Sequence, residues 1–181
     1  MSSGAFTQTG EDLIHVGHVI TLATATFEGP AGELLERDVV RHPGAVAVVA
    51  LDGEQVVMVR QFRPVLGCEM LEIPAGKLDM PGEDRLSAAR RELVEEVGYD
   101  APKLVELGSF HNSVGFCDEL TTIYLATELV PAVQRAVSVE EEYLTIERVH
   151  LDDVEDLVLN GEITDAKTML GLFWMLRRLE R

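Results

Sequence analysis

Residues 76–99 read GKLDMPGEDRLSAARRELVEEVGY, and this stretch predicts a loop that leads into an α-helix. Proline and glycine interrupt its first part, so the helix is expected to begin near Glu83. It is expected to end at Gly98, because glycine readily adopts the left-handed conformation that closes many helices. The larger apolar side chains of this helix then share one stripe, as burial against a core requires: Leu86, Leu93 and Val97.

The same helix carries glutamates at positions i, i+3 and i+4, namely Glu92, Glu95 and Glu96. Like charges at this spacing oppose helix formation by about 0.2–0.5 kcal/mol per pair. One interpretation is that a cation gathers them, and ligands that are all oxygen suit a hard ion such as Mg²⁺ or Mn²⁺. The other interpretation is a solvated acidic face that binds nothing.

This stretch resembles the signature of the Nudix hydrolases. That signature is a glycine, five residues, a glutamate, seven residues, and then Arg-Glu-apolar-any-Glu-Glu-any-Gly-apolar. Every position from Glu83 to Tyr99 matches, but six residues, instead of five, separate Gly76 from Glu83. The extra residue falls in the loop that contains Pro81 and Gly82, where an insertion costs little. The helix that carries the carboxylates is unaffected by it.

Further segments are similar to the ADP-ribose pyrophosphatase branch of this family, over roughly residues 36–170. The resemblance implies an enzyme that hydrolyses a nucleoside diphosphate sugar with a divalent metal ion, first of all ADP-ribose to AMP and ribose 5-phosphate. Alternatives are a pyrophosphatase for another such sugar or a dinucleotide, and a catalytically silent domain that senses ADP-ribose. The intact carboxylates argue against silence. The similar segments are GAVAVVALDGEQVVMVRQFR, EIPAGKLD, GFCDE and GEITDAKT.

The resemblance also implies which residues hold the metal. Carried over to this chain, the ligands are Glu92, Glu96 and the backbone carbonyl of Ala75. Glu95 is a weaker candidate, because its helical angle points further from the apolar stripe. Glu83 either braces the loop, binds a metal through water, or complements the helix dipole. Arg91 is expected to orient a neighbouring carboxylate.

In that branch an acidic loop supplies the general base that takes a proton from the attacking water. Residues 139–143, VEEEY, resemble that loop. Glu140 and Glu142 share a side if the segment is extended, so either is favoured over Glu141. The alternative is a solvated acidic run.

Candidate substrate contacts lie around the second strand of an expected hairpin. Arg60 and Arg63 end this strand, and the resemblance implies that Arg63 contacts the phosphates, since arginine grips phosphate oxygens bidentately. Glu69 and Glu72 follow on the next strand, where one of them would accept from a ribose hydroxyl.

Three further candidates lie elsewhere in the sequence. Arg37 and Phe27 belong to the segment that reaches a partner subunit and the adenine in related enzymes; otherwise they are a surface charge and a core aromatic. Glu119 either binds the terminal ribose or caps a strand edge. The branch carries a proline sixteen residues beyond the signature's last glycine, and here that position is Val114, which weakens the ADP-ribose assignment.

Composition favours one enzyme domain in the cytoplasm. The formal charge of −17 argues against nucleic acid or an anionic membrane as partner. Two cysteines, Cys68 and Cys117, lack metal-type spacing, and both are expected to be small buried residues in a reducing compartment. Neither a membrane span nor a signal peptide is expected.

The pattern of elements predicts an α/β fold, and the resemblance narrows it to an α/β/α sandwich with a mixed sheet. Residues 1–40 are expected to form antiparallel strands that build a homodimer, and residues 41–181 the Nudix domain. The apolar helix at the C-terminal end adds to the expected interface. Strands are expected at 13–26, 34–40, 45–51, 55–61, 70–73, 104–110, 120–129 and 145–149, and further helices at 153–160 and 165–178.

Overall fold

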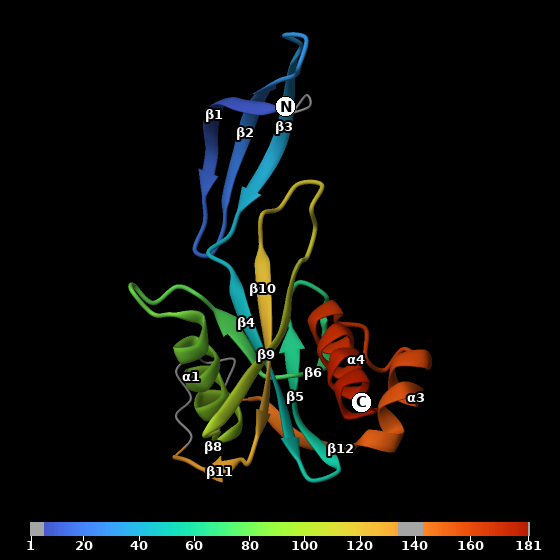
Figure 1. Cartoon of the computed structure of the whole chain (residues 1–181). Helices are drawn as coiled ribbons and strands as arrows, with labels where there is room; N and C mark the ends of the chain where they lie inside the picture. Colours follow the sequence, from blue (N-terminus) through green and yellow to red (C-terminus); the bar gives the residue numbers. More distant parts are fainter. Residues whose placement is uncertain (1–5, 134–142, 181) are drawn as a thin grey trace. The chain divides into compact units, whose positions relative to one another are not determined.

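The computed structural model describes residues 6–133 and 143–180. The chain divides into two compact units, one of Met1–Gly44 with His111–Leu120 and one of Ala45–Phe110 with Thr121–Arg181. The first unit contains an antiparallel sheet, and the second contains a mixed sheet with helices (Figure 1). The α/β class and the N-terminal antiparallel strands predicted from the sequence are confirmed.

The sheet of the first unit consists of β1 (Thr7–Val16), β2 (Thr21–Glu28) and β3 (Leu34–Arg41). The prediction of one strand over residues 13–26 was wrong, because a turn divides it between β1 and β2. Gly17 closes that turn, and its N–H donates to the carbonyl of Ile20 at 2.8 Å. The two strands are therefore antiparallel neighbours.

A later stretch of the chain completes this unit beside β3. The N–H of Val40 donates to the carbonyl of Phe116 at 2.7 Å, and the N–H of Asp118 donates to the carbonyl of Val40 at 3.2 Å. Arg41 forms ion pairs with Glu11 of β1 and, at 3.1 Å, with Asp118. Backbone bonds and charge pairs together hold residues 116–118 on the edge of β3.

The sheet of the second unit has the order β12-β5-β4-β10-β9, with β6 paired to β5 and β7 paired to β4. β4 is parallel to β10 and antiparallel to β5 and β7, which makes the sheet mixed. A small pair, β8 and β11, lies outside it. The last residue of β9, His111, and the first of β10, Leu120, are counted with the first unit. The elements are β4 (Ala45–Asp52), β5 (Gln55–Arg63), β6 (Cys68–Glu72), β7 (Ala75–Lys77), α1 (Arg85–Val97), β8 (Tyr99–Asp100), β9 (Lys103–His111), β10 (Leu120–Thr127), β11 (Val130–Pro131), β12 (Thr145–His150), the 3₁₀ turn η1 (Leu151–Asp153), α3 (Val154–Leu159) and α4 (Ala166–Glu180).

Helices cover both faces of this sheet, so its central strands are apolar on both sides (Figure 1). In β4, Val46 and Val48 pack in the cluster that contains α1, whereas Ala47 and Val49 pack in the cluster that contains α3 and α4. The alternation follows from the two-residue period of a strand. The predicted α/β/α layering therefore has two separate hydrophobic cores.

Details of α1 correct three expectations. The helix begins at Arg85, with Asp84 as its N-cap accepting from the N–H of Leu86 at 2.9 Å, so Glu83 precedes the helix and its helix-dipole interpretation was wrong. Leu86 is 47% exposed, because it stands in the first turn and burial begins at Ala88. Gly98 closes the helix in the left-handed conformation at φ 69°, as predicted.

Cys68 is exposed and Cys117 is partly buried, so the expectation of two buried cysteines was wrong. Cys68 begins β6 beside an exposed turn, which explains its accessibility. In the described ranges every helix is too short or too polar to cross a bilayer.

Candidate active site

The site is organised where β4 and β5 separate. The two strands pair only near their hairpin, and beyond it β5 pairs with β6 while β4 pairs with β7. The connection between β6 and β7 therefore crosses from one strand to the other. Pro74 lies in this connection, and its carbonyl accepts from the N–H of Val48 at 2.8 Å. This crossing brings Ala75 and Gly76 beneath α1.

Two glutamates of α1 point toward β7. The side chain of Glu92 is 10% exposed, and the residue Glu96 is 6% exposed. Glu96 accepts a hydrogen bond from the N–H of Ala75 at 3.0 Å. Burial raises the pKa of Glu96 to about 8 and the charge of Glu92 adds to the effect, although the Ala75 hydrogen bond opposes it. One turn of helix thus presents two mostly buried carboxylates to the loop.

Gly76 is necessary for this close approach. A Cβ at position 76 would lie within 3.0 Å of the carboxylate of Glu92, closer than real Cβ atoms come to other atoms. The structure therefore gives a steric reason for the first glycine of the signature. The glycine leaves the space that the Glu92 carboxylate fills.

Arg91 bonds to three carboxylates of the signature, one of which is Glu92. Its Nη1 donates to Glu92 at 2.6 Å and to Glu95 at 2.9 Å, and its Nη2 donates to Glu83 at 2.9 Å. The hydrogen bond to Glu83 is the main reason that the pKa of Arg91 lies above its ordinary value. The prediction that Arg91 orients a neighbouring carboxylate agrees with this contact to Glu92. Glu83 is thereby tied to α1, which agrees with its interpretation as a brace of the loop.

The fit of a divalent metal ion follows from these contacts. In the part of the chain that the structure describes, no three His, Cys, Asp or Glu side chains already form a metal-binding group. Glu83, Glu92 and Glu95 all bond to Arg91, and of these carboxylates Glu92, together with Glu96, lies beside β7. Two buried carboxylates that repel each other, with only oxygen to offer, suit a hard divalent cation. The residues therefore fit the ion that the sequence predicts.

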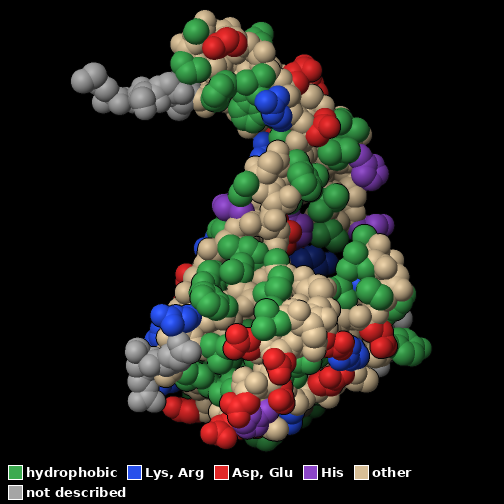
Figure 2. Space-filling view, turned by 90° about the vertical axis from the view of Figure 1, so that its right-hand side faces the viewer, with side chains coloured by type: hydrophobic (Ala, Val, Ile, Leu, Met, Phe, Trp, Pro, Cys, Tyr) green, Lys and Arg blue, Asp and Glu red, His purple; other side chains and the backbone are tan. Residues whose placement is uncertain are grey.

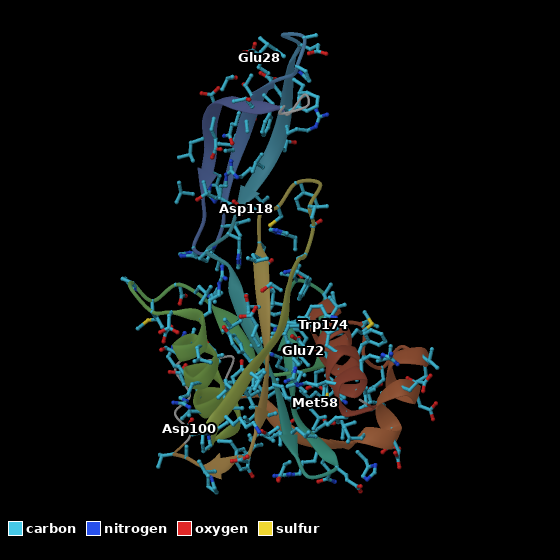
Figure 3. All side chains as sticks on the ribbon, viewed as in Figure 1. Glu28, Met58, Glu72, Asp100, Asp118 and Trp174 are labelled. Carbon is cyan, nitrogen blue, oxygen red and sulfur yellow. The ribbon has the colours of Figure 1, made fainter. Side chains whose placement is uncertain are left out.

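A second group of charges lies next to these carboxylates, between the sheet and α4. Glu72 is 1% exposed, and its two oxygens accept from Nε of Arg63 at 2.7 Å and from Nη2 of Arg63 at 2.6 Å. Lys167 of α4 also pairs with Glu72, which is labelled in Figure 3. Burial would raise the pKa of Glu72, but Arg63 and Lys167 outweigh it and hold this pKa below its ordinary value. A cavity of about 420 Å³ opens beside Arg63, Glu72 and Lys167.

The other predicted substrate contacts are more dispersed. Arg60 forms ion pairs with Glu147 and, at 2.9 Å, with Glu162, so Arg63 rather than Arg60 lies near Glu72. Glu69 is exposed on β6 opposite Phe62. Of the two glutamates considered on this strand, only Glu72 lies in the charged group.

The candidates of the first unit are described within that unit alone. Phe27 is half-buried on β2, and Arg37 is exposed on β3. Glu119 is half-buried, with its carboxylate 4.0 Å from Nδ1 of His42. Val114 is 83% exposed. The predicted general base, Glu140 or Glu142, lies outside the described residues.

The sequence reasoning missed three residues of the site, although it quoted the segment that holds them. Asp165, Lys167 and Thr168 lie at the start of α4 in the GEITDAKT segment. Asp and Thr are typical residues at the N-terminal cap of a helix, and here they stand at the start of an apolar helix. This pattern could have marked the segment as the start of a helix.

A helix of buried carboxylates above a glycine loop, on a mixed sheet covered by helices, defines a class of protein. Residues 40–170 match the profile of the family described as NUDIX domain. The chain therefore belongs to the Nudix family and is a Nudix hydrolase.

Individual relatives are similar over nearly the whole chain. An "ADP-ribose pyrophosphatase" from Bacillus subtilis (strain 168) is 40% identical over 91% of this chain and 89% of the relative. An "ADP-ribose pyrophosphatase" from Mycobacterium tuberculosis is 34% identical over 95% and 84% of the two chains. A "Methanol dehydrogenase activator" from Bacillus methanolicus is 39% identical over 90% and 88%. A solved structure described as "ADP compounds hydrolase" has a TM-score of 0.82 and 23% identity over 97% of this chain and 94% of the other, which shows the shared fold.

Proposed function

We propose that this chain hydrolyses ADP-ribose to AMP and ribose 5-phosphate with Mg²⁺, or with Mn²⁺ in its place. The observation that carries the proposal is the buried pair of Glu92 and Glu96 over Gly76, with Arg63 nearby. Similarity to two ADP-ribose pyrophosphatases, at 40% and 34% identity, supports the choice of substrate.

Glu92, Glu96 and the carbonyl of Ala75 would hold the metal ion, with Glu95 as a weaker candidate. An ion held there would neutralise charge on the diphosphate oxygens and lower the pKa of water. Arg91 keeps Glu92 in place through its hydrogen bond of 2.6 Å. The N–H of Ala75 does the same for Glu96.

The reaction itself needs one water molecule and one base. The water oxygen bonds to one phosphorus as the bond between that phosphorus and the bridging oxygen breaks. One product gains the water oxygen, and the bridging oxygen leaves with the other product. We assign the removal of the water proton to Glu140 or Glu142. Arg63 would bind the non-bridging phosphate oxygens through donors that it does not use on Glu72, and bidentate binding of this kind is stronger than that of lysine.

The charge of the protein makes local cations essential to this function. The formal charge is −17, and Figure 2 shows acidic side chains gathered on one end of the second unit. A diphosphate substrate is repelled by such a surface. The bound metal and Arg63 would make the electrostatic potential positive at the site alone. A small molecule fits such a local site, whereas nucleic acid or an anionic membrane would meet the negative surface around it.

We also propose that the chain works in the cytoplasm as a homodimer, built by residues 1–40. The first unit exposes several large apolar side chains, which an interface would cover. Arg37, Phe27 and Glu119 would then serve the substrate from this unit, as the sequence suggests. The apolar side chains exposed by 56–70% in this unit are Phe6, Leu13, Ile14, Val16 and Leu34.

Product analysis with Mg²⁺ tests the proposed reaction. The panel contains ADP-ribose, ADP-glucose, GDP-mannose, NADH, a diadenosine polyphosphate and a deoxynucleoside triphosphate, with Glu96→Gln as the inactive control. Preferential formation of AMP from ADP-ribose, abolished by Glu96→Gln, supports the proposal.

Two other results would change the assignment. Preference for a different compound would keep the proposed hydrolysis and change the assigned substrate. Val114, which is exposed and stands where the related enzymes carry a proline, gives a structural reason for such a change. Tight binding of ADP-ribose without turnover of any compound favours a sensor.

A further inference from the structure

Lys167 lies where the first turn of α4 meets the end of β6. Its side chain is 16% exposed and pairs with two carboxylates, Glu72 and, at 2.9 Å, Asp165. Few lysines are this buried, because burial of an ammonium group is favourable only when the charge is paired. The two pairs fix the ammonium group between the helix and the strand.

The backbone around Lys167 is fixed as well. Asp165 accepts from the N–H of Thr168 at 3.0 Å and from its hydroxyl at 2.6 Å. The hydroxyl oxygen of Thr168 in turn accepts from the N–H of Ile73 at 3.0 Å, and both Thr168 and Ile73 are fully buried. This chain of bonds ties the start of α4 to the residue that follows Glu72.

Glu72 connects Lys167 to Arg63. Two nitrogens of Arg63, Nε and Nη2, donate to the two oxygens of Glu72, and the oxygen that accepts from Nη2 also receives Lys167. A carboxylate with a single partner can still turn about its last torsion, whereas a second donor on one oxygen restricts that rotation.

Arg63 keeps donors for a ligand in this arrangement. Among residues 6–133 and 143–180, its side chain forms no hydrogen bonds other than those to Glu72, so Nη1 retains its donors. The charge of Arg63 also lowers the pKa of Glu96, so the guanidinium lies within electrostatic range of this proposed metal ligand.

We propose that Lys167 is a positioning residue that acts through Glu72 to hold the guanidinium of Arg63 in one orientation. Its effect on turnover rests on the proposed function, because there Arg63 binds the diphosphate. Its effect on Arg63 itself does not.

A direct test observes Arg63 without any substrate. The Nε–H group of Arg63 is assigned in ¹⁵N-labelled protein by comparison with Arg63→Lys, and its ¹H–¹⁵N heteronuclear Overhauser effect reports motion. The wild type is expected to give a value close to that of the backbone, and Lys167→Met a value lower by about half, as for a flexible group. Lys103→Met is the matched control, because Lys103 is exposed and lies 4.0 Å from its acidic neighbour. An unchanged signal of Arg63 in Lys167→Met overturns the proposal.

Two more variants keep the test decisive. If Lys167→Met does not fold, Lys167→Gln retains a neutral donor for Glu72 and is expected to give an intermediate signal. Lys167→Arg, which restores the charge, should return the Arg63 signal toward the wild type. A signal that Lys167→Gln leaves unchanged overturns the proposal equally.

A double-mutant cycle then measures the consequence for substrate. Lys167→Met is expected to lower kcat/KM about tenfold, mainly through KM, but less than twofold when Arg63 is already alanine. Equal losses in both backgrounds would assign Lys167 a purely structural effect. If ADP-ribose is not turned over, the cycle is measured on whichever compound of the panel is, and the resonance of Arg63 decides the positioning role by itself.

Discussion

Replacement of Gly76 by alanine tests the site with one methyl group. Gly76 does not have a positive φ, so alanine introduces no backbone strain of that kind. Its Cβ would overlap the carboxylate of Glu92, which must retreat by more than about 1 Å to reach ordinary van der Waals contact. The methyl group therefore acts on the proposed metal ligand and on little else.

The size of the effect follows from that displacement. A shift of about 1 Å in a catalytic group lowers turnover on the order of 10²-fold. Movement of Glu92 also breaks its hydrogen bond with Arg91, at a cost of about 1–3 kcal/mol, while alanine stabilises by about 0.4–1 kcal/mol through the unfolded chain. We expect kcat/KM to fall about a hundredfold, and the free energy of unfolding to fall by only roughly 1–2 kcal/mol.

The assay is the initial rate of AMP formation over a titration of Mg²⁺, with urea unfolding on the same samples. Gly10→Ala is the matched control, because its Cβ would meet nothing closer than 3.8 Å. Glu92→Asp is the diagnostic partner: the shorter side chain leaves room for the methyl group, so Gly76→Ala should cost less in that background. Activity and Mg²⁺ dependence of Gly76→Ala within twofold of the wild type would refute the reasoning.

Three further perturbations address the supports of the site. Arg91→Met leaves Glu83, Glu92 and Glu95 without their shared cation, and we expect urea unfolding to show a loss of roughly 2–4 kcal/mol, with a loss below 1 kcal/mol contradicting it. The pKa of Glu72 is lowered in the folded chain, so its contribution to the free energy of unfolding is present above its ordinary pKa of 4.5 and is lost as pH falls. The free energies of unfolding of wild type and Glu72→Gln, plotted against pH, should therefore converge between about pH 5 and 3. Parallel plots would count against this role of Glu72. Gly171→Ala places a Cβ 2.9 Å from Val49, and overpacking of about 1–3 kcal/mol should exceed the helix-propensity gain of about 1 kcal/mol, so a raised melting temperature would show that the helix can yield.

Features of the fold that depend on neighbouring residues were predictable from the sequence. Gly98 ends α1 as expected, and the hairpin around Asp52 and Gly53 joins β4 and β5. The turn at Gly17 was missed, because residues 13–26 read as one apolar run and the Gly17 turn contains neither proline nor Asn-Gly. Local turn chemistry was too weak there to show in the pattern.

The site was predictable where it lies in one segment and not where it joins distant ones. Spacing on a helix predicts that Glu92, Glu95 and Glu96 lie together, and the family resemblance selects Glu92 and Glu96 among them. The partner of Glu72 does not, because Lys167 stands 95 positions later and only the packing of α4 brings them together. Likewise the sequence shows that Gly76 belongs to a signature, but the carboxylate that requires it becomes evident only in three dimensions.

The bond between Thr168 and Ile73 has a consequence for how the protein is made. The ribosome releases β6, the glycine loop and α1 well before α4 is synthesised. Until Asp165, Lys167 and Thr168 emerge, Glu72 lacks its lysine and the N–H of Ile73 lacks its acceptor. A nascent chain arrested before Asp165 would therefore contain the complete signature without the contacts that fix Glu72 and Ile73. Catalytic competence is thus expected to arise late in translation.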